Sequence, residues 1–525
     1  MGLVGAGVLS LLLTAWLLVH WLILPHIEQF RGAIEQRATA ALGVPVRMGG
    51  IQVTSSGWVP SFELRDVVLL GPDGKPALKL PRVVAALSPR SLLALELRFE
   101  QLLIDNAQLD VQRDAQGRLR IAGLDMSAPS SAPPEDATVL TDWFFKQHEL
   151  VIRGASVRWS DAMRGRGEQS NSGSGQRSAP LVLADVQFVL RNGLRQHDFR
   201  LDGTPPSEWG DRFSVSGKFT QPLLARPGDW QRWSGALHAD LPRADLHELR
   251  GHVELPLDLS EGHGALRAWL EVRDGKVTAG TTDVALRDVV LRLAPELQAL
   301  TFAHLQGRLL AEQQGDSLRL SAQKFSFAVM KTDDNPAGSA WQWPRSDMSL
   351  ALRCERACTR GAALRSGEFT AQRLDLGLMA EMAQHLPLTD GLRLRLSELR
   401  PQGLVTGLST RWDGPIDAPT AYQVKALFSG FSLAARPGPD PGPGTGPGTG
   451  PQPEGRTLGR PGLSGATVEL SANEKGGQAQ LSLASGGTVD LPGVFAESVV
   501  PFDQLNSLLQ WRIEPTPSAA SSATA

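Results

Sequence analysis

Histidine and serine are the residues of this chain best suited to metal or nucleophilic chemistry, but their spacing matches no established pattern. No His-Glu-x-x-His motif and no Cys/His zinc pattern occurs. The segment GLSGA at 462–466 only faintly resembles a nucleophile elbow, because it lacks the final glycine and precedes a predicted strand. We therefore expect no enzyme, no catalytic residue, no metal site and no cofactor. The ten histidines are His20, His26, His148, His197, His238, His247, His252, His263, His304 and His385.

The two cysteines, Cys354 and Cys358, lie in the segment CERAC. Their spacing is not Cys-x-x-Cys, and a zinc site here would lack its other ligands, so neither redox catalysis nor metal binding is expected. In an oxidising compartment the pair could form a disulfide that closes a small loop, and in a reducing one it would remain as free thiols.

Charge and glycine content limit the partners and the fold. The chain of 525 residues has 52 basic and 55 acidic side chains and a net charge of -3, so no nucleic-acid partner is expected. Glycine and proline are frequent, with 54 and 36 residues, which predicts many short segments separated by turns.

The N-terminus predicts a membrane anchor. Residues 2–24 contain no charged side chain and are long enough for one transmembrane helix, with Trp16 and Trp21 toward its end. A cleaved signal peptide is the alternative, but no small-x-small site follows Leu24. Arg31 and Arg37 follow the helix and nothing basic precedes it, a bias that by itself favours a cytoplasmic C-terminal side.

After the anchor the hydrophobic period changes from helical to two. Residues 26–43 have apolar side chains at helical spacing, and Gly43 and Pro45 end the helix. Beyond them, apolar and polar residues alternate in many segments, which predicts half-buried strands. In LRLSAQKFSFAV the apolar phase runs through 318, 320 and 322 and then through 325, 327 and 329, which predicts a β-bulge near Lys324.

Two short sequence motifs, called here the repeated phrases, recur along the chain. LRDVV occurs at 64–68 and again at 286–290, with LADVQ at 183–187 between them. The apolar positions of IDNAQLDV at 104–111 return in IRGASVRW at 152–159 and in LSGATVEL at 463–470. Repeated β units of this kind favour an extended, solenoid-like sheet over compact domains.

Helices and flexible segments interrupt the strands. Amphipathic patterns at 137–150 and 374–388 predict short helices, whereas 126–136, 161–180, 435–462 and 515–525 are rich in Pro, Gly and Ser. The predicted divisions are an anchor (1–25), an amphipathic helix (26–43), a first β-repeat region (44–125), a linker with a short helix, a strand and a loop (126–180), a β-repeat body (181–434), a disordered insertion (435–462), a final β-repeat region (463–514) and a disordered tail (515–525).

The order of these elements resembles the AsmA-like superfamily. The resemblance rests on the N-terminal helix, the ending ALGVPV, FELRDVVLL, and the run LSPRSLLALELRFEQLLIDNAQLDVQRDAQGRLRIAGL. The later ELVIRGASVRWSD and SGATVELSANEKGGQAQLSLASGGTVDLPGVFAESVVPFDQLNSLLQW are similar to its YhdP branch, which is related to TamB. Members of that branch are much longer, so we expect this chain to be a short form or a fragment.

The resemblance implies a mainly β fold, with an N-terminal transmembrane helix and an extended, repetitive antiparallel β-groove. It also implies a single-pass protein of the bacterial inner membrane, with a periplasmic body that moves glycerophospholipids toward the outer membrane and maintains envelope integrity. Its partners would be the inner membrane, phospholipids and other envelope proteins. The alternative is a structural scaffold or assembly factor that carries no lipid. The alternating strand predicted in LRLRLSEL makes Leu392, Leu394 and Leu396 candidate groove-lining residues.

Overall fold

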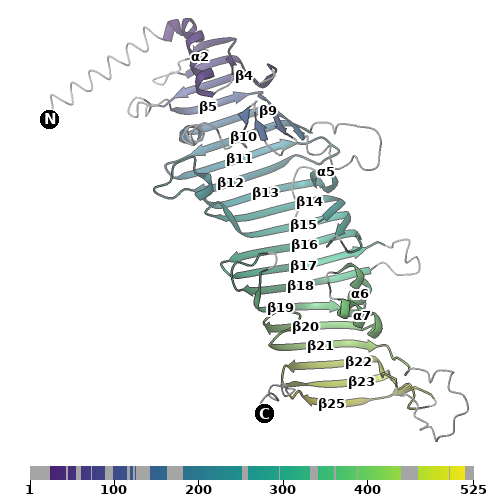
Figure 1. Ribbon diagram of the computed structural model, residues 1–525. Helices are drawn as coiled ribbons and strands as arrows, with labels where there is room; N and C mark the ends of the chain where they lie inside the picture. The colour runs from purple at the N-terminus through teal and green to yellow at the C-terminus, as the bar shows by residue number, and fades with distance from the viewer. Residues whose placement is uncertain are drawn as a thin grey trace, which may run out of the picture. The chain divides into compact units, whose positions relative to one another are not determined.

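The chain forms two compact units, each built on β-strands. Figure 1 shows the computed structural model with its strands and helices labelled. Residues 1–245 and 266–277 belong to the first unit, and residues 246–265 and 278–525 to the second. The fold is mainly β, as the sequence predicts. The structure describes residues 24–42, 45–54, 61–71, 74–88, 91, 98–114, 119–121, 124–125, 142–161, 181–250, 258–294, 296–330, 341–359, 362–386, 388, 390–438, 459–495 and 497–514.

In the first unit, β9 to β13 follow one another as antiparallel neighbours, and β3 pairs with β4 on one side and with β1 and β2 on the other. Residues 142–146 form a further helical turn. The elements are η2 (Leu24–Phe30), α2 (Arg31–Leu42), β1 (Val46–Arg47), β2 (Gly50–Thr54), β3 (Ser61–Leu70), β4 (Pro76–Leu87), β5 (Phe99–Asp105), β6 (Gln108–Arg113), β7 (Leu119–Ile121), β8 (Leu124–Asp125), β9 (Glu149–Asp161), β10 (Leu181–Asn192), β11 (Gln196–Thr204), β12 (Phe213–Thr220), η4 (Trp230–Arg232) and β13 (Ser234–Asp245).

One pairing in the first unit departs from the predicted antiparallel sheet. Strand β9 runs parallel to β5 and β6, with Ile104 opposite Ile152 and Val111 opposite Trp159. Parallel neighbours need a crossover connection, and the long segment between β6 and β9 supplies it. The matching phrases of β5–β6 and β9 therefore lie side by side in the sheet and in the same direction.

In the second unit, β15 to β23 pair consecutively as antiparallel neighbours, and β24 and β25 both pair with β23. Strands β14 (Asp258–Arg273) and β15 (Lys276–Arg292) contribute residues to both units. The other elements are α5 (Leu246–Arg250), β16 (Leu300–Gln314), β17 (Ser317–Val329), β18 (Trp341–Cys354), β19 (Leu364–Asp375), α6 (Leu376–Glu381), η5 (Met382–His385), α7 (Asp390–Leu399), β20 (Gln402–Asp413), β21 (Ala421–Leu433), β22 (Gly462–Asn473), β23 (Gly476–Asp490), β24 (Val499–Phe502) and β25 (Leu505–Arg512).

Each of the repeated phrases contains one residue with a left-handed backbone conformation. In the LRDVV group, Asp66, Asp185 and Asp288 have φ angles of 52°, 45° and 52°. Asp, Asn and Gly tolerate positive φ better than other residues, which explains their place in the repeated phrases. In the second group the same conformation occurs at Asn106, Gly154 and Gly465.

Each of these left-handed residues precedes a buried apolar one. Val289 and Ala466, which follow Asp288 and Gly465, are 1% and 0% exposed. A left-handed residue forms a bulge that adds one residue to the strand. The apolar side chain that follows it therefore points to the same face as the apolar side chains that precede it. The other residues in the corresponding position, Val67, Ala107, Ala155 and Val186, are also buried.

The bulge predicted near Lys324 is confirmed. Lys324 has a φ of 50°, and the β17–β18 register shifts between Ala322 and Phe325. The backbone N–H of Lys324 donates to Asp347 Oδ1 at 2.6 Å, so a side chain of the neighbouring strand satisfies the donor that the bulge removes from the ladder.

Outside the strands, the structure contains several of the predicted helices. Helix α2 lies in the segment after the predicted anchor, and its Ile34 and Ala38 pack against the buried cluster that includes Val46 and Val67. Residues 142–146 and the α6–η5 segment are helical within the ranges predicted from amphipathic patterns.

Several predictions concern residues that are not described. The predicted anchor lies almost wholly outside the described residues, as do most of the linker, the Pro/Gly-rich insertion and the tail. Among the helices within the described ranges, none is both long and apolar enough for a membrane span.

The left-handed conformation of Asp288 leads to a testable prediction about stability. Asp288→Val should lower the free energy of unfolding by about 1–3 kcal/mol, because a β-branched side chain strongly disfavours positive φ. Asp288→Asn should change it by less than about 0.5 kcal/mol, because Asn tolerates this conformation. Denaturant unfolding of both variants measures the difference, and equal stability would contradict a strained backbone at this position.

Candidate functional site

The sheet of the second unit has two chemically different faces. Its described strands form a single sheet with no second sheet packed on it. The strand register aligns side chains in rows across the sheet, and neighbouring rows along a strand point to opposite faces. One face is called here the apolar face. One of its rows consists of Ala311, Leu320, Leu350, Phe369, Thr410 and Val424. The adjacent row consists of Leu309, Ala322, Met348, Ala371 and Leu408.

The opposite face, called here the polar face, holds charged side chains and hydroxyl groups. Arg308 donates to Asp283 with distances of 2.6 and 2.8 Å, and this ion pair raises the pKa of Arg308. Arg411 Nη2 lies 3.1 Å from Glu368 Oε2 in a second pair. One row of this face consists of Glu312, Arg319, Ala351, Glu368, Arg411 and Gln423.

The apolar face stays partly open to solvent. Leu309 and Leu320 are each 38% exposed, although both lie in the middle of long strands. Covering apolar area is favourable by about 25 cal/mol per Å², so partly uncovered leucines in two adjacent rows form a surface suited to an apolar ligand. At one end, α6 packs against β18, β19 and β20, where Leu374 and Val405 are buried.

Aromatic rings pack over glycines on neighbouring strands. Gly367 is the cross-strand partner of Trp412, and a Cβ atom at 367 would overlap the indole ring. Gly477 has the same relation to Trp511. An aromatic ring packed over glycine in a neighbouring strand buries that backbone and covers the sheet with little added thickness.

The first unit has a similar apolar face. One row contains Leu150, Leu190, Phe199, Gly217 and Leu237, and a Cβ atom at Gly217 would collide with the Phe199 ring. As in the second unit, a glycine leaves space for an aromatic side chain of the adjacent strand. The next row contains Ile152, Phe188, Leu201, Val215 and Ala239.

A buried polar cluster lies at one end of this face. His197 is 1% exposed and stacks on Trp233 with ring centroids 3.9 Å apart. Its Nδ1 lies 2.7 Å from Asn192 Oδ1, and its Nε2 lies 3.1 Å from Gln221 Oε1. Asn192 Nδ2 donates to the carbonyl of Gln147, so its oxygen faces the ring and His197 Nδ1–H is the donor. Each ring nitrogen of His197 thus has a side-chain oxygen beside it, which holds the ring in place, and the cluster has a structural role.

The three candidate groove-lining leucines do not lie on a strand. Leu392, Leu394 and Leu396 belong to helix α7, so the predicted strand was wrong. Leu and Arg are strong helix formers, and here their propensity prevails over the alternating pattern, which by itself favours a strand. Leu392 and Leu394 are exposed and Leu396 is half-buried, outside the rows of the apolar face.

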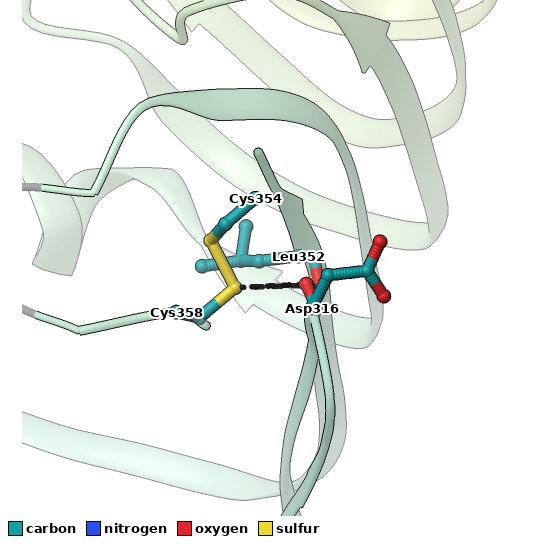
Figure 2. The surroundings of a disulfide bond; sticks show 4 residues. All are labelled: Asp316, Leu352, Cys354 and Cys358. Carbon is teal, nitrogen blue, oxygen red and sulfur yellow. Dashed lines mark hydrogen bonds between the residues drawn. A yellow bond between two sulfur atoms is a disulfide. The ribbon is translucent and has the colours of Figure 1, made fainter. Parts of the chain in front are cut away.

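The two cysteines are joined by a disulfide. Cys354 ends β18, and its Cα atom lies 5.4 Å from that of Cys358 in the following loop. Figure 2 shows the bond beside Asp316, whose carbonyl oxygen lies 3.2 Å from Cys358 Sγ. The bridge ties the loop to the end of β18. Within the described ranges, no group of acidic, histidine and cysteine side chains is arranged to hold a metal ion.

The residues of the open face were not predicted as lining a groove. Leu318, Leu320 and Ala322 were assigned to a strand with a bulge, and the structure places them on the apolar face. The alternation in residues 305–313 could have indicated Leu309 in the same way. Neither pattern gives the cross-strand neighbours, because these depend on register.

Comparison with known proteins assigns the chain to a protein family. The sequence model of the family described as "YhdP protein" matches residues 2–517. The resemblance found in the sequence is therefore confirmed. No protein of curated function and no solved structure matches the chain.

A substitution at Gly367 tests the packing of the apolar face. Gly367→Ala should lower the free energy of unfolding by about 1–3 kcal/mol, because the added methyl group must displace the Trp412 ring. Gly391→Ala is the matched control, since a Cβ atom there meets nothing within 4 Å and Ala favours the helix. Denaturant unfolding measures both; equal destabilisation would contradict the ring-over-glycine contact.

The buried histidine predicts a pH dependence. Burial lowers the pKa of His197, an effect partly offset by the hydrogen bond with Gln221 and the charge of Asp198. The unfolded state therefore binds a proton more readily, and stability should fall as the pH drops below about 6.5 toward the folded pKa. Thermal unfolding between about pH 7 and pH 5 should show a smaller loss in His197→Gln than in the unmodified protein. Identical pH slopes would refute the assignment.

Proposed function

Because the chain belongs to the YhdP family and carries an open apolar face, we propose that it provides a path for glycerophospholipids through the bacterial cell envelope. The observation that carries this proposal is the uncharged pair of rows that includes Leu309, Leu320 and Phe369. An acyl chain on these rows would leave water, which is favourable by about 0.8 kcal/mol for each CH₂ group. The phosphate-containing headgroup would remain in solvent.

The proposal includes no chemical step. Passage of a lipid breaks no covalent bond, so the protein would act without a catalytic residue, metal or cofactor. Its energetics would depend on a surface that is apolar over many strands, because a lipid moving from one row to the next then exchanges similar contacts. Rows shared by β16 to β21 supply such a surface.

The proposed location is the inner membrane, with residues 2–24 as the anchor and the β-sheets in the periplasm. The disulfide between Cys354 and Cys358 supports an oxidising compartment, since such bonds are rare in the reducing cytosol. The arginines that follow the anchor favour the opposite orientation, but the disulfide is the more specific indicator of compartment.

A structural scaffold of the envelope is the second candidate. The disulfide, the ion pairs of the polar face and the aromatic–glycine packing suit a rigid support as well as a lipid path. The partly exposed leucines favour lipid, because a scaffold that binds no apolar molecule gains nothing from leaving them uncovered.

Photo-crosslinking at neighbouring positions separates the two candidates. A photoreactive residue at Leu309 or Leu320 should capture phospholipid in cells, because both side chains lie on the apolar face. The matched controls are Arg308 and Arg319, which lie one position away on the same strands and point to the polar face. Mass spectrometry of the captured adducts identifies the lipid. Equal capture at all four positions, or none at 309 and 320, would favour the scaffold.

A charged substitution adds a functional measurement. Leu320→Asp should remain folded, because this partly exposed position lets water reach the carboxylate, but lipid capture at position 309 should decrease. Circular dichroism checks the fold, and crosslinking at 309 in the double variant checks the path. Undiminished capture would contradict a path that passes Leu320.

A further inference from the structure

The polar face of the second unit has a depression near the ends of β21, β22, β23 and β25. Its volume is about 510 Å³, and its lining combines two cations with several side-chain amides. None of its lining residues is acidic. The residues of the lining with amide or cationic side chains are Gln423, Asn473, Lys475, Gln478, Gln510 and Arg512.

A glycine creates the hollow. Across the polar face, one row runs from Gln423 through Asn473 and Gly476 to Arg512, so the row lacks a side chain at its third position. A Cβ atom at Gly476 would overlap the carbonyl oxygen of Trp511, so the close approach of β23 and β25 requires a glycine. Asn473 and Arg512, the neighbours of Gly476 in this row, line the depression on either side of the gap.

The cations of this depression lack carboxylate partners. Arg308 and Arg411 elsewhere on the same face are held by Asp283 and Glu368, but Lys475 and Arg512 have no acidic group within 4.0 Å among the described residues. Nearby, the Glu474 carboxylate lies 3.4 Å from the backbone nitrogen of Tyr422 and does not line the depression. Two cations without carboxylate partners that line one depression attract an anion.

The amides extend the set of donors and acceptors. Gln478 and Gln510 face each other across β23 and β25. Asn473 Oδ1 accepts from the Lys475 backbone N–H at 2.9 Å, which leaves its Nδ2 available as a donor. Amides suit hydroxyl groups, which both donate and accept, whereas the cations suit phosphate oxygens.

We propose that this depression binds a phosphate ester that carries hydroxyl groups, with Lys475 and Arg512 at the phosphate and the amides at the hydroxyls. Arg512 and the amides lie in rows of the polar face, opposite the proposed lipid path, and Gly477 and Trp511 complete the lining. The proposal does not depend on the lipid path. The same chemistry occurs in a phospholipid headgroup and in a soluble sugar or glycerol phosphate, so the test includes both sources.

Calorimetric titration of the full chain tests the proposal. sn-Glycerol 3-phosphate should bind at millimolar or lower concentration, inorganic phosphate more weakly, and glycerol not at all. Lys475→Gln combined with Arg512→Gln should weaken glycerol 3-phosphate binding by about tenfold or more. The matched control is Arg319→Gln, which removes a cation of the same face outside the depression and should leave the affinity unchanged.

The outcomes decide between the alternatives. Tighter binding of a short-chain phosphatidylglycerol than of glycerol 3-phosphate would identify a lipid headgroup as the source, and equal or weaker binding a soluble ester. Glycerol 3-phosphate that fails to bind, or binds equally to the double variant, would overturn the proposal. Circular dichroism checks the fold of the double variant. If that variant unfolds, Lys475→Gln alone, in an exposed turn, should still weaken binding, and an unchanged affinity would overturn the proposal.

Discussion

A single-layer sheet depends on keeping its apolar side chains on one face along every strand. The strands here reach 17 residues in β15, and over that length the twist of a strand changes the direction of its side chains. Left-handed residues within the strands shift the alternation of apolar and polar positions by one residue. The apolar residue that follows each of them therefore points to the same face as the apolar residues that precede it. Val289 after Asp288 and Ala466 after Gly465 are the most completely buried examples.

This constraint explains why the repeated phrases combine Asp, Asn or Gly with a small or β-branched apolar residue. The first position must accept positive φ, and the second must fit between neighbouring strands. In the parallel pair of the first unit, Asn106 and Gly154 are adjacent, and the backbone N–H of Asn106 donates to the carbonyl of Arg153. Two bulges therefore lie side by side, and the ladder continues past both of them.

The two faces of the second unit's sheet follow from the same alternation. On the apolar face, packing against glycine lets Trp412 and Trp511 cover backbone without a second layer of protein. On the polar face, ion pairs such as Arg308–Asp283 are solvent-exposed and contribute little to stability, so their main effect is to keep this face hydrated. A sheet with this difference between its faces can offer an apolar surface to one ligand and a polar surface to another.

The sequence by itself determined the β class, the bulge at Lys324, the helical segments at α2 and at α6–η5, and the family. Each of these depends on local patterns: period-two alternation, a phase shift within one strand, or the order of recognisable segments. Tertiary structure decided what local patterns cannot encode. Residues 392–396 alternate like a strand but form a helix, because the helix propensity of Leu and Arg opposes the alternating pattern, and the pattern alone does not show which of the two prevails. The parallel pairing of β9 and the neighbours of Leu309 and Leu320 depend on register and on long connections between strands, which bring together residues that are distant in the chain.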